Sequence, residues 1–202
     1  MTRNPHKNPN PQGKGVVPVL ADWQATRPIA IQEKAPDVLL RDWFTSALVL
    51  SADFQFRPAS GQSYYLYHRA DGWRLSLIAP QEWSSERSGT CLGRCELRDD
   101  MTWLLEPRDG LEHEDELLRE LAALVEAFAE ELDASASLAE QVPGYRRDLP
   151  YQQRMLATAL GTSLRLSVDD IARLDQPARL LLEAAGGFSA PALLAPRDGA
   201  SD

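Results

Sequence analysis

The chain has 202 residues, of which 44% are hydrophobic and 25% charged, and its formal net charge is -9. This composition is typical of a folded protein with one well-buried core and excludes wholesale disorder. An acidic chain is not expected to bind nucleic acids in general, because phosphate contacts need clustered Lys and Arg. No apolar run reaches the length of a membrane span, and the N-terminus lacks the apolar stretch of a secretory signal. We therefore expect a cytoplasmic protein without a membrane segment.

Residues 1–27 are expected to form a flexible, basic tail. The segment begins with a stretch rich in Pro, Asn, Gly and Lys, which buries too little apolar surface to order itself. Of the 21 basic residues, Arg3, Lys7 and Lys14 lie within residues 1–20, and all 30 acidic residues come after them. A basic tail on an acidic body predicts either a solubilising segment or a contact with an anionic surface, such as a nucleic acid or a ribosome.

The tail contains a short apolar segment, Val16 to Trp23, which we treat as a docking hook. The residues expected to make its contacts are Val17, Leu20 and Trp23. Apolar side chains gain free energy only when something covers them. The hook is therefore expected to dock either on the body of its own chain or on that of a neighbour.

An α+β core domain is expected over residues 28–142, and it begins with a linker and a helix. Pro36 and Asp37 suit the first turn of a helix, and apolar residues then recur at helical spacing. This pattern predicts a helix over residues 37–50, whose last residues, 47–50, also fit the approach to a strand.

The most regular part of the chain is residues 54–105, where apolar and polar residues alternate with the period of a β-strand. Ala70-Asp71-Gly72 joins two such segments and is a strong hairpin signal. Turn residues separate the strands that we predict at residues 53–57, 63–69, 72–79, 91–98 and 101–105. Short connections between consecutive strands predict an antiparallel meander of about five strands.

Four aromatic residues near the hairpin, Tyr65, Tyr67, Trp73 and Trp83, are the candidate binding residues of this sheet. Tyr65 and Tyr67 share one strand face, because side chains alternate with a period of two. Core packing explains aromatic residues most simply. Two other interpretations stay open: exposed rings stack on bases in single-strand binders, and a concave arrangement of the rings would hold a small molecule.

Helices are expected after the sheet. Acidic residues at 112–116 start an amphipathic pattern that predicts a long helix over residues 110–133, lying across one face of the sheet. Pro, Gly and capping residues then divide residues 143–187 into a subdomain of short helices, one of which is expected to end at Gly161. Residues 188–202, rich in Ala and Pro, are expected to be disordered.

No residue pattern indicates catalysis, a cofactor or a metal site. None of the three histidines has a partner at metal-ligand spacing, and His68 near Asp71 predicts an exposed contact across the turn. The acidic residues at 112–116 suit the positive end of a helix dipole better than a metal ion. Cys91 and Cys95 are too far apart on a continuous strand for a disulfide, unless a bulge brings them together. The sequence leans against an enzyme and predicts no cofactor and no metal.

A set of residues in the sheet region carries a family resemblance: Phe56, Pro58, Gly61, Tyr64 to Tyr67, Gly72, Leu75 to Ile78, Pro80 to Trp83, Leu97 and Asp100 to Trp103. The segment that contains them resembles an uncharacterised domain family of unknown function, found in small bacterial and some eukaryotic proteins. The family often has His at the position of Tyr65 and Gly at the position of Ser84, so no role of that histidine carries over. The resemblance implies the α+β fold and no particular activity.

These patterns favour a non-enzymatic, cytoplasmic module that binds another protein through the hook or through the open face of the sheet. One alternative is a nucleic-acid- or ribosome-associated factor led by the basic tail. Another is a small-molecule binder with a pocket of aromatic rings. A homodimer through a sheet edge or the C-terminal helices is also open.

Overall fold

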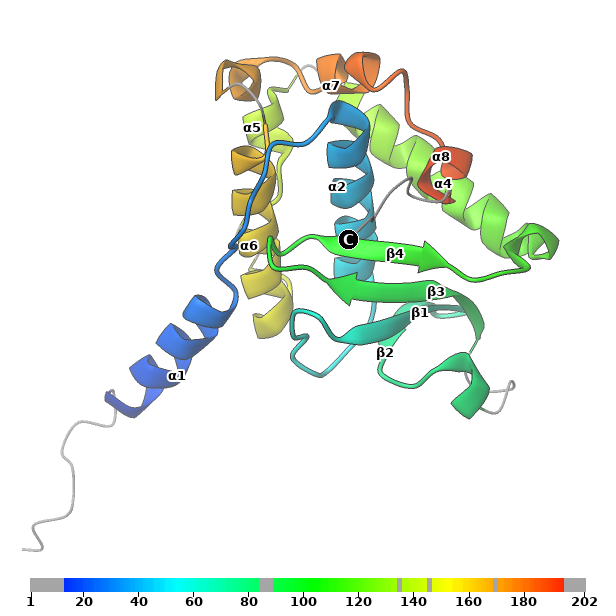
Figure 1. Ribbon diagram of the computed structural model, residues 1–202, viewed down its shortest axis with the longest axis horizontal. Coiled ribbons are helices and arrows are strands. Elements are labelled where there is room, and N and C mark those ends of the chain that lie inside the picture. Colours follow the sequence, from blue (N-terminus) through cyan, green and yellow to red (C-terminus); the bar gives the residue numbers. More distant parts are fainter. Residues whose placement is uncertain (1–12, 84–88, 134–135, 145–146, 169–170, 195–202) are drawn as a thin grey trace, which may run out of the picture.

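A four-stranded antiparallel sheet lies against a layer of helices in the computed structural model (Figure 1). The structure describes residues 13–83, 89–133, 136–144, 147–168 and 171–194. The helices are α1 (Gly13–Ala25), α2 (Pro36–Ser51), α4 (Asp115–Asp133), α5 (Leu138–Gln141), α6 (Tyr151–Leu166), α7 (Arg179–Ala184) and α8 (Ala190–Leu194). The strands are β1 (Ser63–Arg69), β2 (Gly72–Ser76), β3 (Thr90–Leu97) and β4 (Trp103–Pro107), and the 3-10 turns are η1 (Pro80–Glu82), η2 (Leu111–His113) and η3 (Ile171–Asp175).

The strand order is β2-β1-β3-β4, and each neighbouring pair is antiparallel. The predicted hairpin between β1 and β2 is confirmed. The predicted meander is wrong, because the chain crosses from β2 to the far side of β1 before it forms β3. η1 begins this crossing: Pro80 fixes a helical φ and lacks the N–H that a continuing strand needs.

The strand predicted at residues 53–57 does not form, so the sheet has four strands where about five were expected. Asp53 alone of this segment pairs with the edge of β2. Its N–H donates to the Trp73 carbonyl at 2.8 Å, and its carbonyl accepts from the Leu75 N–H at 3.1 Å. The chain then leaves the edge, because Phe56 packs against the hydrophobic core.

α2 lies in the middle of the helical layer and contacts β2 and β4 (Figure 1). The predicted helix at residues 37–50 is confirmed. Leu40 is fully buried and Phe44 nearly so, because the apolar stripe of the helix faces the sheet and the neighbouring helices. The Ser46 hydroxyl accepts a hydrogen bond from the Trp103 N–H at 2.9 Å, which joins α2 to β4.

α4 lies beside α2, and not across the sheet as the sequence predicts. The ring of Phe128 meets Trp43 at a centroid distance of 5.5 Å and Phe44 at 5.4 Å, with edge-to-face geometry. α2 occupies the middle of the helical layer, and α4 packs at its side (Figure 1). Its link to the sheet includes His68 of β1 and Glu120, whose Nε2 and Oε2 atoms lie 2.6 Å apart.

α6 continues through Gly161, where the sequence predicts a helix end. A Cβ atom at this position would lie 1.8 Å from the carbonyl oxygen of Pro143, so the close approach of that loop requires glycine. Leu156 and Leu160 of α6 belong to the same hydrophobic cluster as α2 and the sheet. The core thus crosses residue 142, where we predict a boundary between the α+β domain and the helical subdomain.

Both ends of the described chain are helical where the sequence predicts flexible tails. α1 starts at Gly13, and residues 1–12 lie outside the described residues. At the other end Leu193 of α8 is buried, and Phe188 packs on Phe44 with ring centroids 5.6 Å apart. The expectation of disorder is therefore wrong for this C-terminal segment as far as Leu194. Residues 195–202 lie outside the described part of the chain.

Candidate functional site

α1 projects from the body of the molecule (Figure 1), and three of its apolar side chains are exposed. Val19 is 49% exposed, Leu20 55% and Trp23 56%. On the side of α1 that meets the body, Asp22 Oδ1 lies 2.6 Å from Arg57 Nη1. Because the Arg57 side chain is 42% exposed, this ion pair by itself fixes α1 only weakly. About half of the surface of each of the three apolar side chains is open to water.

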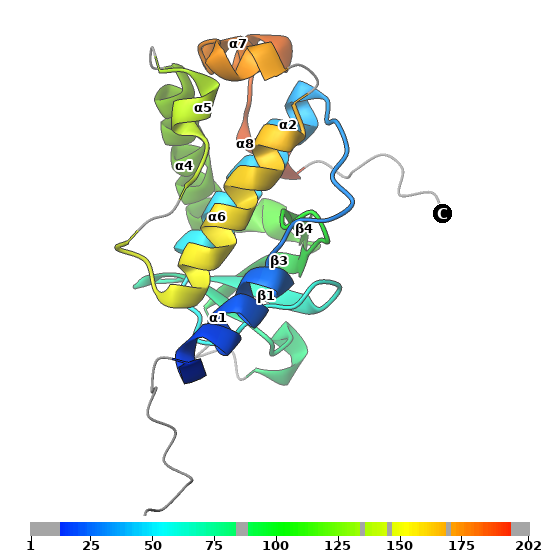
Figure 2. The ribbon, with the colours of Figure 1, turned by 90° about the vertical axis from the view of Figure 1, so that its left-hand side faces the viewer.

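The C-terminal end of α1 lies near α6 (Figure 2). Side chains of the two segments line a shallow groove between them. Its volume is about 210 Å³, and it is lined by Trp23, Thr26, Arg27 and Pro28 on one side and by Met155, Thr158, Ala159 and Thr162 on the other. The apolar surface of α1 thus continues into a hollow on the body. Of the three predicted hook residues, Leu20 and Trp23 lie on this exposed surface. Val17 lies within α1, but its side chain is outside the described part of the structure.

The four predicted aromatic residues of the sheet do not line one pocket. Trp73 lies opposite His68 on the face that meets the helices, and it is buried there. Tyr67 points to the opposite, outer face, where it packs against Trp83 with ring centroids 6.3 Å apart. The Tyr67 hydroxyl donates to the Ile78 carbonyl at 2.9 Å, and burial raises its pKa. Tyr65 is half-buried on the outer face.

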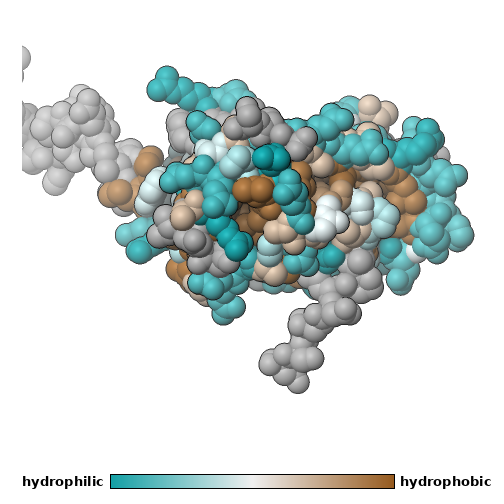
Figure 3. All heavy atoms as spheres, turned by 90° about the horizontal axis from the view of Figure 1, so that it is seen from above, coloured by the Kyte–Doolittle hydropathy of each residue, from teal (hydrophilic) through white to brown (hydrophobic). Residues whose placement is uncertain are grey.

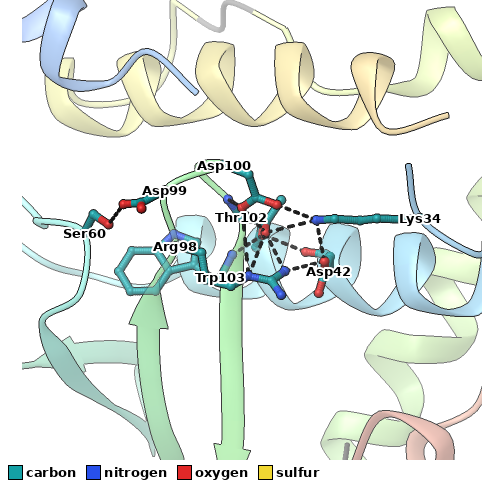
Figure 4. A network of polar contacts seen from close by, with 9 residues as sticks. Lys34, Asp42, Ser60, Arg98, Asp99, Asp100, Thr102 and Trp103 are labelled. Carbon is teal, nitrogen blue, oxygen red and sulfur yellow. Dashed lines mark hydrogen bonds and ion pairs between the residues drawn. The ribbon is translucent and has the colours of Figure 1, made fainter. Parts of the chain in front are cut away.

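A polar network joins the α1–α2 linker, α2 and the turn between β3 and β4 (Figure 4). The Lys34 ammonium lies 2.7 Å from the Asp42 carboxylate and 2.6 Å from the Asp100 carboxylate. Arg98 pairs with Asp42 and donates from Nε to the Thr102 hydroxyl at 3.1 Å. The Asp100 carboxylate accepts from the Thr102 N–H at 3.0 Å and from its hydroxyl at 2.6 Å. Two cations thus face two anions.

The network is suited to holding the fold together. The Asp42 side chain is fully buried, and those of Lys34 and Asp100 are only 10% exposed. Burial by itself would raise the pKa of Asp100, but hydrogen bonds from Lys34 and Thr102 outweigh it and lower the pKa below its ordinary value. Charged groups that pair at close range fix the relative positions of the segments that carry them. They are not poised to react with another molecule.

Sequence analysis missed this network because its members lie far apart in the chain: Lys34 and Thr102 are 68 positions apart. One signal was present. Asp42 lies on the same helical face as the buried Leu39 and Ser46, where a charge is costly unless a partner meets it. A carboxylate on the buried face of a predicted helix indicates a buried cation, although it does not say which one.

The remaining polar groups of interest are bound or buried. His68 pairs with Glu120 of α4, whereas Asp71, its predicted neighbour, pairs with Arg69 at 3.2 Å. Cys91 and Cys95 are both buried free thiols, and burial raises the pKa of each. A raised pKa disfavours the thiolate, which is the reactive form. No group of three His, Cys, Asp or Glu in the described part of the chain is placed to hold a metal ion.

A cavity of about 220 Å³ lies where α2, α5 and α7 meet, at the end of the molecule that Figure 3 looks down on. Figure 3 shows hydrophobic residues in the middle of this face with polar residues around them. The lining is largely apolar and includes Leu39, Leu138 and Leu181, with Lys34 at its edge. Because the Lys34 ammonium is already paired with two carboxylates, the cavity gains no cationic centre from it.

Comparison with known proteins assigns a family. Residues 26–127 match a family model described as "Protein of unknown function (DUF2452)". The chain belongs to this family. Neither a curated protein nor a solved structure matches the chain.

The matched region contains α2, the whole sheet, the polar network and most of α4, and α1 lies before it. The family resemblance predicted from the sheet residues is therefore confirmed, and the match is wider than the segment that carried the resemblance. Among the helices that the structure describes, none combines the length and hydrophobicity that crossing a membrane requires.

Proposed function

We propose that this protein is a protein-interaction module that inserts the apolar stripe of α1 into a groove on another protein. The observation that carries the proposal is the exposure of Val19, Leu20 and Trp23 on a helix that projects from the body. Exposed apolar residues gathered on one helix face are typical of helix-in-groove recognition. A Trp in such a stripe is the residue type most often found to dominate binding energy.

The charges on and around α1 indicate what kind of groove would receive it. Lys14 lies in the first turn of α1 and Arg27 just beyond its last turn, while Asp22 is paired with Arg57 on the body side. Arg27, which is exposed and lines the groove beside Trp23, therefore places a positive charge at the C-terminal end of the apolar stripe. Electrostatic complementarity favours a partner whose apolar groove has an acidic rim.

The test is recovery of partners by the tagged full chain from cells of its source, with matched substitutions on two faces of α1. Leu20→Asp combined with Trp23→Asp places charges in the apolar stripe. Ala21→Asp is the control, because Ala21 is exposed on the other side of the same helix. We expect specific proteins to be recovered by the wild type and by the control, and recovery to fall about tenfold or more with the double variant, since burying unpaired charge is costly.

Equal recovery by all three forms, or no specific protein with the wild type, would contradict the proposal. Recovery of RNA or ribosomal proteins that is lost at high salt and insensitive to the double variant would favour the alternative led by the basic tail. A partner that binds through the apolar stripe is expected to withstand high salt better, because apolar burial is not screened.

A further inference from the structure

The outer edge of β2 is only partly paired. The bonds from Asp53 to the Trp73 carbonyl and the Leu75 N–H show that odd-numbered residues of this strand point their backbone groups away from β1. Beyond this point the chain of residues 54–56 leaves the edge. In the part of the chain that the structure describes, no backbone partner is seen for the carbonyl of Leu75 or for the N–H of Leu77, the first residue after the end of β2. Unpaired groups at a sheet edge are a template for another strand.

A groove of about 370 Å³ lies along this open edge. Its floor is β2 and the residues that follow it. Phe56 forms one wall from the core side, where it stacks on Tyr64, and Trp83 forms the other from the outer face, where it packs on Tyr67. The groove thus has apolar walls on both sides of a polar backbone edge, which is the arrangement that an extended peptide needs.

Two further groups at the groove indicate what would fill it. Trp83 lines the groove, and its indole N–H is buried and has no hydrogen-bond partner among the described residues, so a shift of the ring on binding would let an occupant's carbonyl satisfy this donor. The half-buried Arg74 guanidinium also lines the groove and forms no ion pair within 4.0 Å in the described structure. Its neighbour in register, Asp53, is exposed to water. A donor and a cation favour a carboxylate-bearing occupant.

We propose that the β2 edge binds an extended peptide segment of a partner protein as an added strand, with an acidic side chain of the peptide next to Arg74. The peptide backbone pairs with the Leu75 carbonyl and the Leu77 N–H, and one of its carbonyls accepts from the Trp83 indole. Leu77 and Ile78, which are 47% and 40% exposed, supply apolar contacts for alternate side chains. This site is separate from α1 and stands independently of the function proposed above.

The test begins with a display library of random heptapeptides selected on the full chain, and it continues with affinities of the selected peptides. We expect enriched sequences with an acidic residue at a fixed position. Trp83→Phe keeps an aromatic ring and removes the N–H, so it should weaken binding about threefold to tenfold. Trp23→Phe, the same change on α1, should have no effect. Arg74→Gln should lower affinity for the acidic peptides and not for their amide analogues.

N-methylation of the peptide backbone separates strand addition from other modes of binding. In an added strand only every second N–H bonds to the neighbouring strand, so methylation at alternate positions should abolish binding and at the others should be tolerated. Leu77→Pro, which removes the open N–H of the edge, should also abolish binding without unfolding the sheet. No enrichment, equal binding by Trp83→Phe, or an N-methyl pattern without this alternation would overturn the proposal.

Discussion

The polar network differs from the two proposed binding surfaces, α1 and the β2 edge, in how completely its groups are paired. In the network, Lys34, Arg98 and both carboxylates meet close partners, and the side chains of Lys34, Asp42 and Asp100 are at most 10% exposed. On α1 the apolar stripe is exposed. At the β2 edge the indole N–H of Trp83 has no hydrogen-bond partner in the described chain. Groups that are satisfied within the fold stabilise it. Groups left unsatisfied indicate where something else binds.

Substitutions in the network and substitutions on the binding surfaces should therefore have different effects. Changes in the network should alter the free energy of unfolding and leave binding to the folded fraction unchanged. Changes on α1 or at the β2 edge should alter binding and leave the free energy of unfolding nearly unchanged. The following substitutions test this separation.

Asp42→Ala should have the largest effect on stability. It leaves Lys34 and Arg98 without the fully buried carboxylate that they share. Removing one partner of a buried ion pair costs about 3–5 kcal/mol. Urea unfolding followed by circular dichroism would measure the loss. Glu106→Ala, which breaks the exposed Arg94–Glu106 pair, is the control and should cost at most about 1 kcal/mol. Similar losses for the two variants would show that the network is not a main anchor of the fold.

Gly161→Ala should destabilise the protein by about 1–3 kcal/mol, because the added methyl group forces α6 and the Pro143 carbonyl apart. Gly144→Ala is a matched control in the adjacent loop, since a Cβ there meets no atom within 4 Å. Thermal unfolding of both variants would measure the difference. A neutral Gly161→Ala would show that the loop yields without cost.

The stability contributed by Asp100 should depend on pH. Its pKa is lower in the folded state than in the unfolded state, so the folded protein binds fewer protons at this site. The contribution is therefore present above the unfolded pKa of about 3.9 and is lost as the pH falls through the lower, folded pKa. The free-energy gap between the wild type and Asp100→Asn should be constant above about pH 5 and should narrow as the pH falls below it and through the folded pKa. A constant gap would contradict this assignment.

Trp23→Asp should have the smallest effect on stability, within about 0.5 kcal/mol, because the side chain is exposed and lies away from the core. If the same urea measurement shows a large loss, α1 is docked on its own body and is not available to a partner. That outcome would contradict the statement that the network is paired and the surface of α1 is not.

The sequence predicted the local features well and the long-range ones poorly. Helix α2 and the Asp-Gly hairpin follow from spacing and turn chemistry within a few residues. The order β2-β1-β3-β4 and the loss of a strand at Asp53 depend on where the chain packs after η1 and after Phe56, which no local pattern encodes. Gly161 was misread for the same reason, since the contact that requires it comes from Pro143.

The candidate site shows the same limit. Leu20 and Trp23 were identified from apolar residues after a polar tail, and their exposure is a property that the structure added. Tyr67 and Trp73 were grouped as neighbours in sequence, but the register places them on opposite faces of the sheet. The groove at the β2 edge could not be predicted, because the sequence assigned residues 53–57 to the strand that would have filled it.

The most direct test of the account is site-specific photo-crosslinking in cells of the protein's source. A photoreactive phenylalanine analogue would replace Leu20 in one version of the full chain and Ala21 in another, so that the two probes point about 100° apart around the axis of α1 and lie on different faces of the helix. The account predicts a discrete crosslinked protein from position 20 and none from position 21. Crosslinks of equal yield from both positions, or from neither, would contradict the claim that the apolar stripe of α1 is a binding surface.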